Sequence, residues 1–293
     1  MLLSRSQTKK GNTMKTNALS FGVAKSKLLN SLMLAALAVP GVALAEEASP
    51  HTFTSNVSLV SDYLYRGISQ TNAKPAIQGG FDYSHSSGFY AGVWGSSISW
   101  MTDAGAGLQV ATSSQVELDT YFGFKNSLAG DFTYDVGYLR YNYPATYPAP
   151  MNTVIGTTTW AKGDTDELYG ALGYKWFTLK YSHSLGNTFA LPNASGTSYI
   201  DLSASYPIPD TGITLGAHYG KQTYKGVTAD ALKAASFDPT YSDYKVSVSK
   251  DFSGFVAGLA YSKTNAKDFG YYSTALNKNL GKGTFVLSLS RSF

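Results

Sequence analysis

Polar and apolar residues alternate with a period of two along almost the whole chain after residue 52. Ile213, Leu215 and Tyr219, for example, are separated by polar or small residues. Successive side chains of a β-strand point to opposite faces, so each such segment has one face suited to an apolar medium and one suited to a polar medium. Twelve segments have this pattern: residues 53–66, 76–85, 89–98, 115–125, 132–142, 166–174, 177–184, 198–206, 213–221, 242–250, 255–263 and 283–293.

The connections between these segments alternate between long and short. The long connections are residues 67–75, 99–114, 143–165, 185–197, 222–241 and 264–282, and the short ones are 86–88, 126–131, 175–176, 207–212 and 251–254. Bacterial outer-membrane barrels have this arrangement, with long extracellular loops and short periplasmic turns. The pattern predicts an all-β fold, an antiparallel transmembrane β-barrel of about twelve strands over residues 53–293, with both ends at the periplasmic side. Residues 229–235 are the one helix-capable stretch that we expect in a loop.

The composition is consistent with this fold and excludes several kinds of site. Of the 293 residues, 14% are charged, 14% are aromatic and 29 are glycine, and cysteine is absent. The absence of cysteine excludes a disulfide framework, a thiolate metal site and a cysteine nucleophile. No run of 18 apolar residues occurs after residue 45, so no membrane-spanning helix is predicted there.

Residues 1–45 have the layout of a secretory signal peptide. Six basic residues and no acidic ones precede or flank the apolar run 32–39, and a small-residue cleavage pattern ends at Ala45. We expect export with cleavage after Ala45, from a start at Met1 or Met14, and a short periplasmic segment at 46–52. Removal of 1–45 leaves 17 basic against 19 acidic residues, so net charge gives no reason to expect nucleic-acid binding.

The last predicted strand has an apolar face that ends on an aromatic residue. Phe285, Leu287, Leu289 and Phe293 share this face, which resembles the terminal strand of bacterial outer-membrane barrels. We therefore expect lipid contact and delivery to the barrel-assembly machinery through the strand that ends in Phe293. Tyrosines near predicted strand ends are expected to form interfacial girdles: Tyr63, Tyr65, Tyr83, Tyr138, Tyr143, Tyr219 and Tyr261.

Four segments resemble the TorF family, whose members are assigned as porins. These are SDYLYRGISQT at residues 61–71, PAIQGGFDY at 75–83, GFYAGVWGS at 88–96 and YDVGYLRYNYP at 134–144. The first segment is fairly specific, whereas the others are common in barrel hairpins. The resemblance runs from about residue 55 to the C-terminus and implies a channel in the outer membrane of a Gram-negative bacterium, with no established substrate.

If the apolar face of each strand meets lipid, ten residues are candidates for lining a pore: Asp62, Arg66, Asp82, Glu117, Asp119, Asp135, Lys180, Asp201, His218 and Lys245. Glu167 and Asp243 also point inward, which gives eight acidic against three basic residues. Because rings of charge set ion preference in pores, this excess predicts a preference for cations. The phase of 89–98 stays open, since Phe89 and Val93 compete with Tyr90 and Trp94 for the apolar face.

The strand number predicts a narrow pore, because eight-stranded barrels are filled by side chains and sixteen-stranded barrels enclose wide channels. The main hypothesis is passive diffusion of small polar solutes or ions. The alternative is that inward charges pair and plug a structural or surface-binding barrel. Asp62 and Arg66, ~13 Å apart along a strand, would then pair with a neighbouring strand, at Asp82 for instance. An exported soluble β-protein is a third hypothesis.

We predict no catalytic residue, no metal site and no cofactor. Ser182-His183-Ser184 is the only place where serine flanks histidine on a predicted strand, and sequence neighbours there point to opposite faces. The four histidines are dispersed, without the spacing of a metal site. His218 is expected to face the lumen as a polar lining residue rather than as a base.

Overall fold

The computed structural model describes residues 49–107, 113–147, 154–155, 158–159, 161–268, 271–273 and 277–293. The predicted signal peptide and its cleavage after Ala45 lie outside these residues, as do 46–48 of the expected periplasmic segment.

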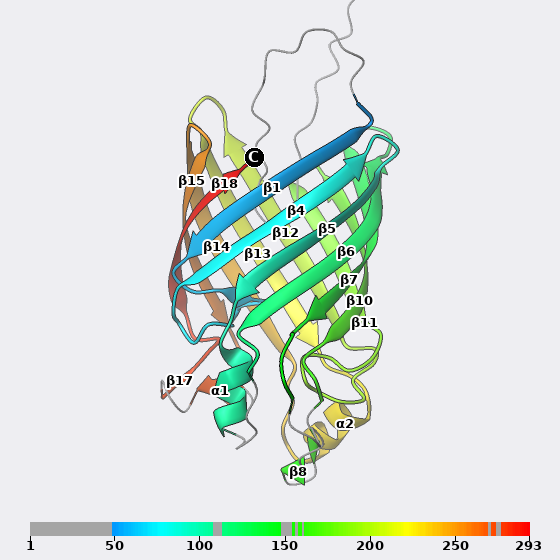
Figure 1. Cartoon of the computed structure of the whole chain (residues 1–293), viewed down its shortest axis with the longest axis vertical. Helices are drawn as coiled ribbons and strands as arrows, with labels where there is room; N and C mark the ends of the chain where they lie inside the picture. The colour runs from blue at the N-terminus through cyan, green and yellow to red at the C-terminus, as the bar shows by residue number, and fades with distance from the viewer. Residues whose placement is uncertain are drawn as a thin grey trace, which may run out of the picture.

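Twelve strands form a closed antiparallel barrel, as the alternation predicts (Figure 1). They are β1 (His51–Val60), β4 (Ala76–His85), β5 (Phe89–Ser97), β6 (Val116–Ser127), β7 (Phe132–Asn142), β10 (Thr165–Tyr174), β11 (Phe177–Ser184), β12 (Ser198–Ile208), β13 (Ile213–Thr223), β14 (Tyr241–Phe252), β15 (Phe255–Thr264) and β18 (Thr284–Ser292). Each strand pairs with the next one along the chain. β1 and β18 close the barrel, with Val57 opposite Arg291.

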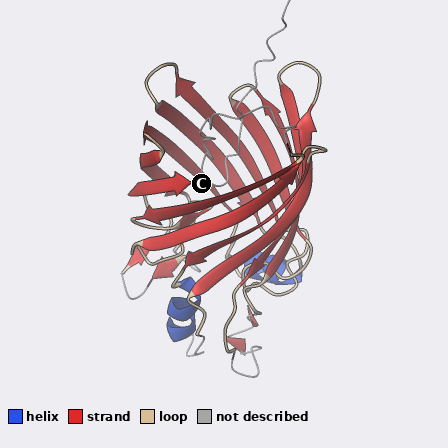
Figure 2. Cartoon of the chain, turned by 45° about the horizontal axis from the view of Figure 1, so that its top comes forward, coloured by secondary structure: helices blue, strands red, loops and turns tan. Residues whose placement is uncertain are grey.

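The shorter elements are α1 (Trp100–Gly107), α2 (Val227–Ala234) and the strand pairs β2 (Leu64–Tyr65) with β3 (Ile68–Ser69), β8 (Val154–Ile155) with β9 (Thr158–Thr159), and β16 (Tyr272–Ser273) with β17 (Lys278–Asn279). Among them, α1, α2, β8 and β17 lie at the end of the barrel that carries the long connections (Figures 1 and 2). α2 covers most of the predicted helix-capable stretch. Within the described part of the chain, no helix is long and apolar enough to span a membrane.

Burial alternates along the strands because one face of the wall is outside and the other inside. Phe53, Phe81 and Phe285 are 75%, 69% and 67% exposed on the outer face. The phase of β5 is now decided, since Trp94 is 4% exposed whereas Val93 on the opposite face is 41% exposed. An apolar outer face around a closed sheet, with backbone hydrogen bonds satisfied between strands, is the form of β-structure that spans a membrane.

The first strand is shorter than predicted, because it ends at Val60 rather than at residue 66. Beyond Val60 the chain leaves the wall and turns into the barrel, where β2 and β3 form a short hairpin. Period-two alternation continues into residues 61–66, of which only Leu64–Tyr65 form a strand. The hairpin turns at Gly67, whose φ of +77° favours glycine and whose added Cβ would lie 2.8 Å from Cβ of Asp243.

Three of the predicted girdle tyrosines lie inside the molecule instead. Tyr63 and Tyr65 belong to the segment that turns inward, and Tyr143 is only 3% exposed beneath the long connections. Their hydroxyl-bearing rings suit a buried polar interior as well as an interface, so position near a strand end did not distinguish the two. The other four face outward: Tyr83, Tyr138, Tyr219 and Tyr261.

Candidate functional site

Residues 61–75, here called the inner segment, connect β1 to β4 through the interior of the barrel. The segment begins beside β18, where the Ser61 N–H donates to the Leu287 carbonyl at 2.9 Å. Further along, the Ser69 N–H donates to the Leu280 carbonyl at 3.1 Å, in the connection that leads into β18. Backbone hydrogen bonds at both places anchor the inner segment to the wall.

Asp62 fixes the internal shape of the inner segment. Its Oδ1 accepts hydrogen bonds from the Ser69 hydroxyl at 2.6 Å and from the Thr71 hydroxyl at 3.0 Å. Burial raises the pKa of Asp62, and the hydrogen bonds from Ser69 and Thr71 offset this only in part. The carboxyl group therefore ties the start of the segment to its return. Asp62 and Arg66 do not pair with each other, as expected from their spacing, and neither has Asp82 as its partner.

Arg66, at the tip of the inner segment, reaches the opposite wall. Its Nη2 donates to both carboxylate oxygens of Glu167, at 2.7 and 3.0 Å, and its Nη1 donates to Oε1 of Gln222 at 2.6 Å. The guanidinium also lies 4.3 Å from the ring centroid of Tyr199. The side chains of Arg66 and Glu167 are 7% and 2% exposed, so a dry ion pair joins the segment to β10.

Near its start, the inner segment meets two acidic residues of β6. The Tyr63 hydroxyl donates to Oε1 of Glu117 at 2.8 Å, and the Tyr63 ring packs edge-on against Trp94. Glu117 and Asp119 are 1% and 2% exposed, and Oδ1 of Asp119 has no hydrogen-bond partner among the described residues. No described basic group forms an ion pair with either carboxylate. The place where the inner segment meets β6 is therefore more acidic than the place where Arg66 meets β10.

His218 on β13 lies between two carboxylates. Its Nδ1 is 2.9 Å from Oδ2 of Asp201, and its Nε2 is 2.8 Å from Oδ1 of Asp243. Each ring nitrogen faces a carboxylate oxygen, an arrangement that fits a protonated imidazole with two donors. The Ser203 hydroxyl lies 3.1 Å from Nδ1, but a protonated ring accepts no proton from it. The cluster is therefore a network in which one imidazolium faces two carboxylates, and not a nucleophile with its base.

Gly220 makes this cluster possible. In the register of the sheet it lies directly between Asp201 on β12 and Asp243 on β14. A Cβ at this position would overlap the Tyr199 hydroxyl and lie 2.8 Å from Oδ2 of Asp243. The missing side chain leaves room for His218, two residues away on the same strand, to reach both neighbours.

Tyrosines donate to the two remaining acidic candidates. The Tyr121 hydroxyl donates to Oδ1 of Asp82 at 2.5 Å, and the Tyr90 hydroxyl donates to Oδ1 of Asp135 at 2.6 Å. The inner face of β4 to β7 thus carries carboxylates held by large aromatic side chains. Lys125, whose ammonium lies 4.9 Å from the Tyr90 ring centroid, also faces inward and was not predicted.

A cavity of about 470 Å³ lies between the inner segment and the strands from β11 to β18 and β1. Six of the ten predicted lining residues contribute to its surface: Asp62, Arg66, Lys180, Asp201, His218 and Lys245. The other four lie on the inner face of β4, β6 and β7, where hydrogen bonds or burial place them: Asp82, Glu117, Asp119 and Asp135. The sequence pattern predicted the facing of every strand except β5, but it did not predict the inner segment that divides these two groups.

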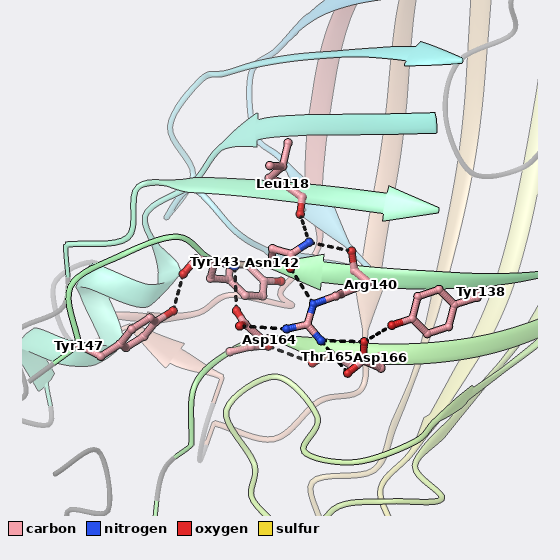
Figure 3. Close-up of polar contacts among 10 residues, drawn as sticks. Leu118, Tyr138, Arg140, Asn142, Tyr143, Tyr147, Asp164, Thr165 and Asp166 are labelled. Carbon is pink, nitrogen blue, oxygen red and sulfur yellow. Dashed lines mark hydrogen bonds and ion pairs between the residues drawn. The ribbon is translucent and has the colours of Figure 1, made fainter. Parts of the chain in front are cut away.

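A second polar network, here called the rim cluster, lies on the outer face of β7 and β10 (Figure 3). Arg140 on β7 donates from Nη1 to Oδ1 of Asp166 on β10 at 2.9 Å, and from Nε to Oδ1 of Asn142 at 2.8 Å. Asp164 lies 3.5 Å from the guanidinium, and the Tyr138 hydroxyl donates to Asp166. The cluster sits at the end of the barrel with long connections, where polar groups meet a headgroup region rather than lipid tails.

One comparison with known proteins gives a bacterial family. A family model described as a bacterial protein of unknown function, Gcw_chp, matches residues 44–293. The chain belongs to the Gcw_chp family. No curated protein matches this Gcw_chp chain.

Several solved structures resemble the Gcw_chp chain at low sequence identity. The KdgM porin is 8% identical with a TM-score of 0.43, over 83% of this chain and 99% of that one. The P. putida toluene transporter TodX is 10% identical with a TM-score of 0.42, over 84% and 93%. The outer membrane protein OprD from Pseudomonas aeruginosa is 12% identical with a TM-score of 0.36, over 78% and 61%.

Proposed function

We propose that this Gcw_chp protein is an outer-membrane channel that allows small polar solutes to diffuse passively across the outer membrane of a Gram-negative bacterium. Its outer face is largely apolar apart from the rim cluster, and its inner face carries charged and hydroxyl groups. In this proposal residues 1–45 form a signal peptide that is cleaved after Ala45, and residues 46–52 remain in the periplasm. The strand that ends in Phe293 engages the barrel-assembly machinery.

The observation that carries the proposal is the polar cavity inside the barrel. A structural barrel of this width would be filled by interlocked side chains, whereas here a volume of about 470 Å³ remains beneath the inner segment. The inner segment narrows the lumen from the side of the long connections, so solute size is limited there. The porin assignment of the TorF family, which four segments of this chain resemble, agrees with this proposal.

A preference for cations belongs to the same proposal. It rests on the inward acidic residues that have no basic partner, rather than on the total number of inward charges. Arg66 neutralises Glu167, and His218 lies between Asp201 and Asp243. The acidic excess therefore comes from the second of the two carboxylates that share His218 and from five that form no ion pair among the described residues: Asp62, Asp82, Glu117, Asp119 and Asp135.

Single-channel recording across a planar bilayer tests the proposal directly. The mature chain, refolded in detergent and checked by heat-modifiable gel mobility, is expected to give discrete conductance steps with a reversal potential that favours potassium over chloride. The Asp82→Asn, Asp135→Asn double variant keeps the tyrosine donors satisfied and is expected to shift the reversal potential toward zero. A folded chain that never conducts overturns the channel proposal, and a chloride preference overturns the selectivity.

The second candidate function is a non-conducting barrel that acts through its long connections. It is favoured by the inner segment, which contacts strands on both sides of the lumen through Tyr63 and Arg66. Absence of conductance together with normal folding would favour this candidate. Removal of residues 227–234, which form α2, would then abolish surface binding without changing the barrel.

A further inference from the structure

Two ammonium groups face the cavity without an acidic partner. Lys180 on β11 and Lys245 on β14 both line it, and neither forms an ion pair within 4.0 Å in the part of the chain that the structure describes. The Lys180 ammonium lies 3.8 Å from the ring centroid of Tyr169, a contact that holds it in place but leaves its charge uncompensated. Their hydrogen-bond donors are available to a ligand.

The other charged groups around the cavity are already occupied. The Arg66 guanidinium binds both oxygens of Glu167, the His218 ring binds Asp201 and Asp243, and Asp62 accepts hydrogen bonds from Ser69 and Thr71. A ligand carboxylate would have to displace the ion pairs of Arg66 and His218, whereas it can approach Lys180 and Lys245 without breaking any ion pair. The two lysines are therefore the positive groups that a ligand can reach in this cavity.

The wall next to the lysines consists largely of small hydroxyl side chains. Ser205, Ser247, Ser249 and Ser288 line the cavity, and none of their hydroxyl groups has a hydrogen-bond partner among the described residues. Each hydroxyl both donates and accepts a hydrogen bond. A row of free hydroxyls matches the hydroxyl groups of a polyol and offers little to an apolar molecule.

We infer that this cavity is a binding site for a small hydroxylated carboxylate anion, such as a sugar acid. Lys180 or Lys245 would bind the carboxylate, and the serine wall would exchange hydrogen bonds with the ligand hydroxyls. A volume of about 470 Å³ is within the usual range for small-ligand sites. The inference rests on the proposed channel function and names the solute class that would reach this site.

A local anion site is compatible with an overall cation preference. Bulk salt samples the whole lumen, including the four uncompensated carboxylates on β4, β6 and β7. A ligand held by short contacts responds mainly to the nearest charges, because the effective dielectric and the solvent weaken more distant ones. The cation preference is thus assigned to the wall formed by β4, β6 and β7, and the anion site to the wall that carries Lys180 and Lys245.

Isothermal titration of the refolded mature chain with sodium gluconate tests the site. Gluconate is expected to bind, and neutral sorbitol, which has the hydroxyls without the charge, is expected not to bind. Acetate and inorganic phosphate, as their sodium salts, are expected to bind at least tenfold more weakly than gluconate. Absence of gluconate binding overturns the inference, and equal binding of phosphate overturns the part assigned to the serine wall.

Variants locate the site. The double variant Lys180→Gln, Lys245→Gln is expected to lose gluconate binding, whereas Lys125→Gln, an inward lysine away from the cavity surface, retains it. Unchanged binding in the double variant overturns the inference. The titration does not need conductance, so a silent channel that binds gluconate contradicts the proposed function alone, and a conducting channel that does not bind gluconate contradicts the inference alone.

Discussion

Two ion pairs on β10 are one residue apart and lie on opposite faces of the barrel wall. Asp166 points outward to Arg140, with side-chain exposures of 33% and 39%, in the rim cluster of Figure 3. Glu167 points inward to Arg66, with exposures of 2% and 7%. The two pairs have the same chemistry, and only the face of the strand differs.

The difference shows what each face requires of a charge. The outer pair is partly solvated, so losing one partner leaves a group that water or a headgroup can satisfy. The inner pair is desolvated, and Gln222 and Tyr199 complete the surroundings of its guanidinium. Removing one inner partner leaves a buried charge uncompensated. The inner pair therefore holds the inner segment across the lumen, whereas the outer pair contributes little to the stability of the barrel.

Glu167→Gln is expected to have the largest effect. It leaves the Arg66 guanidinium buried without its counter-charge, which costs about 3–5 kcal/mol in comparable cases. The inner segment has fewer contacts to retain it than the barrel wall, so we expect the segment to detach while the barrel stays closed. Single-channel recordings should show larger conductance steps with more frequent transitions between levels.

The matched control replaces both partners, as Arg66→Met with Glu167→Met, so that no charge is left behind. This double variant should keep step sizes closer to those of the native chain than Glu167→Gln does. Identical conductance in native and Glu167→Gln channels would contradict the role of this ion pair in holding the segment.

Gly220→Ala tests the inner face again, at the cluster around His218. The added methyl group would overlap the Tyr199 hydroxyl, so Tyr199 must move away from Asp243, at a cost of about 1–3 kcal/mol for overpacking. Gly170→Ala on the outward side of β10 is the control, since the nearest atom to its new Cβ is 4.0 Å away. Urea unfolding in detergent should separate the two variants, and equal midpoints would contradict the crowding inferred at Gly220.

The wall of the barrel could be predicted from the sequence because each strand records its environment in a short-range pattern. All twelve strands, and the alternation of long and short connections, follow from residues two apart and from turn lengths. The facing of Lys180 and Lys245 followed from the same pattern. Only β5 stayed ambiguous, since Tyr90 and Trp94 are as apolar as their outward neighbours.

The inner segment could not be predicted in this way, because its partners are distant in sequence. Polar and apolar residues alternate over 61–66 as in a strand, so the pattern assigned them to the wall, although only Leu64–Tyr65 form a strand. The contact of Arg66 with Glu167 spans 101 residues, and no local signal specifies it. Gly67 was the one residue in this stretch that indicated a turn. The pattern of polar and apolar residues did not show the chain reversing there.

Asp62 is expected to make the stability of the inner segment depend on pH. This residue lies inside the barrel but belongs to none of the strands of the wall. Because burial raises its pKa above 3.8, the folded segment binds protons more readily than the unfolded one. Stability of the segment should therefore fall as pH rises through the interval above 3.8. Hydrogen exchange of the peptide covering residues 61–75, corrected for intrinsic rates, should show this slope, and Asp62→Asn should flatten it.

Ser69→Ala provides the opposite test at the same site. It removes a hydroxyl whose hydrogen bond lowers the pKa of Asp62, so the interval in which protection depends on pH should widen. A flat profile in the native chain, or a narrower interval in Ser69→Ala, would show that Asp62 does not control the segment.

Asp166→Asn in the rim cluster is expected to have the smallest effect and completes the comparison on β10. The amide keeps an acceptor for Arg140 and for the Tyr138 hydroxyl, and Asp164 remains 3.5 Å from the guanidinium. With both partners a third or more exposed, the change should be within about 1 kcal/mol and should shrink further in high salt. Urea midpoints measured at low and high salt check this. A loss as large as that of Glu167→Gln would mean that the outer face, too, holds its charges in a dry environment.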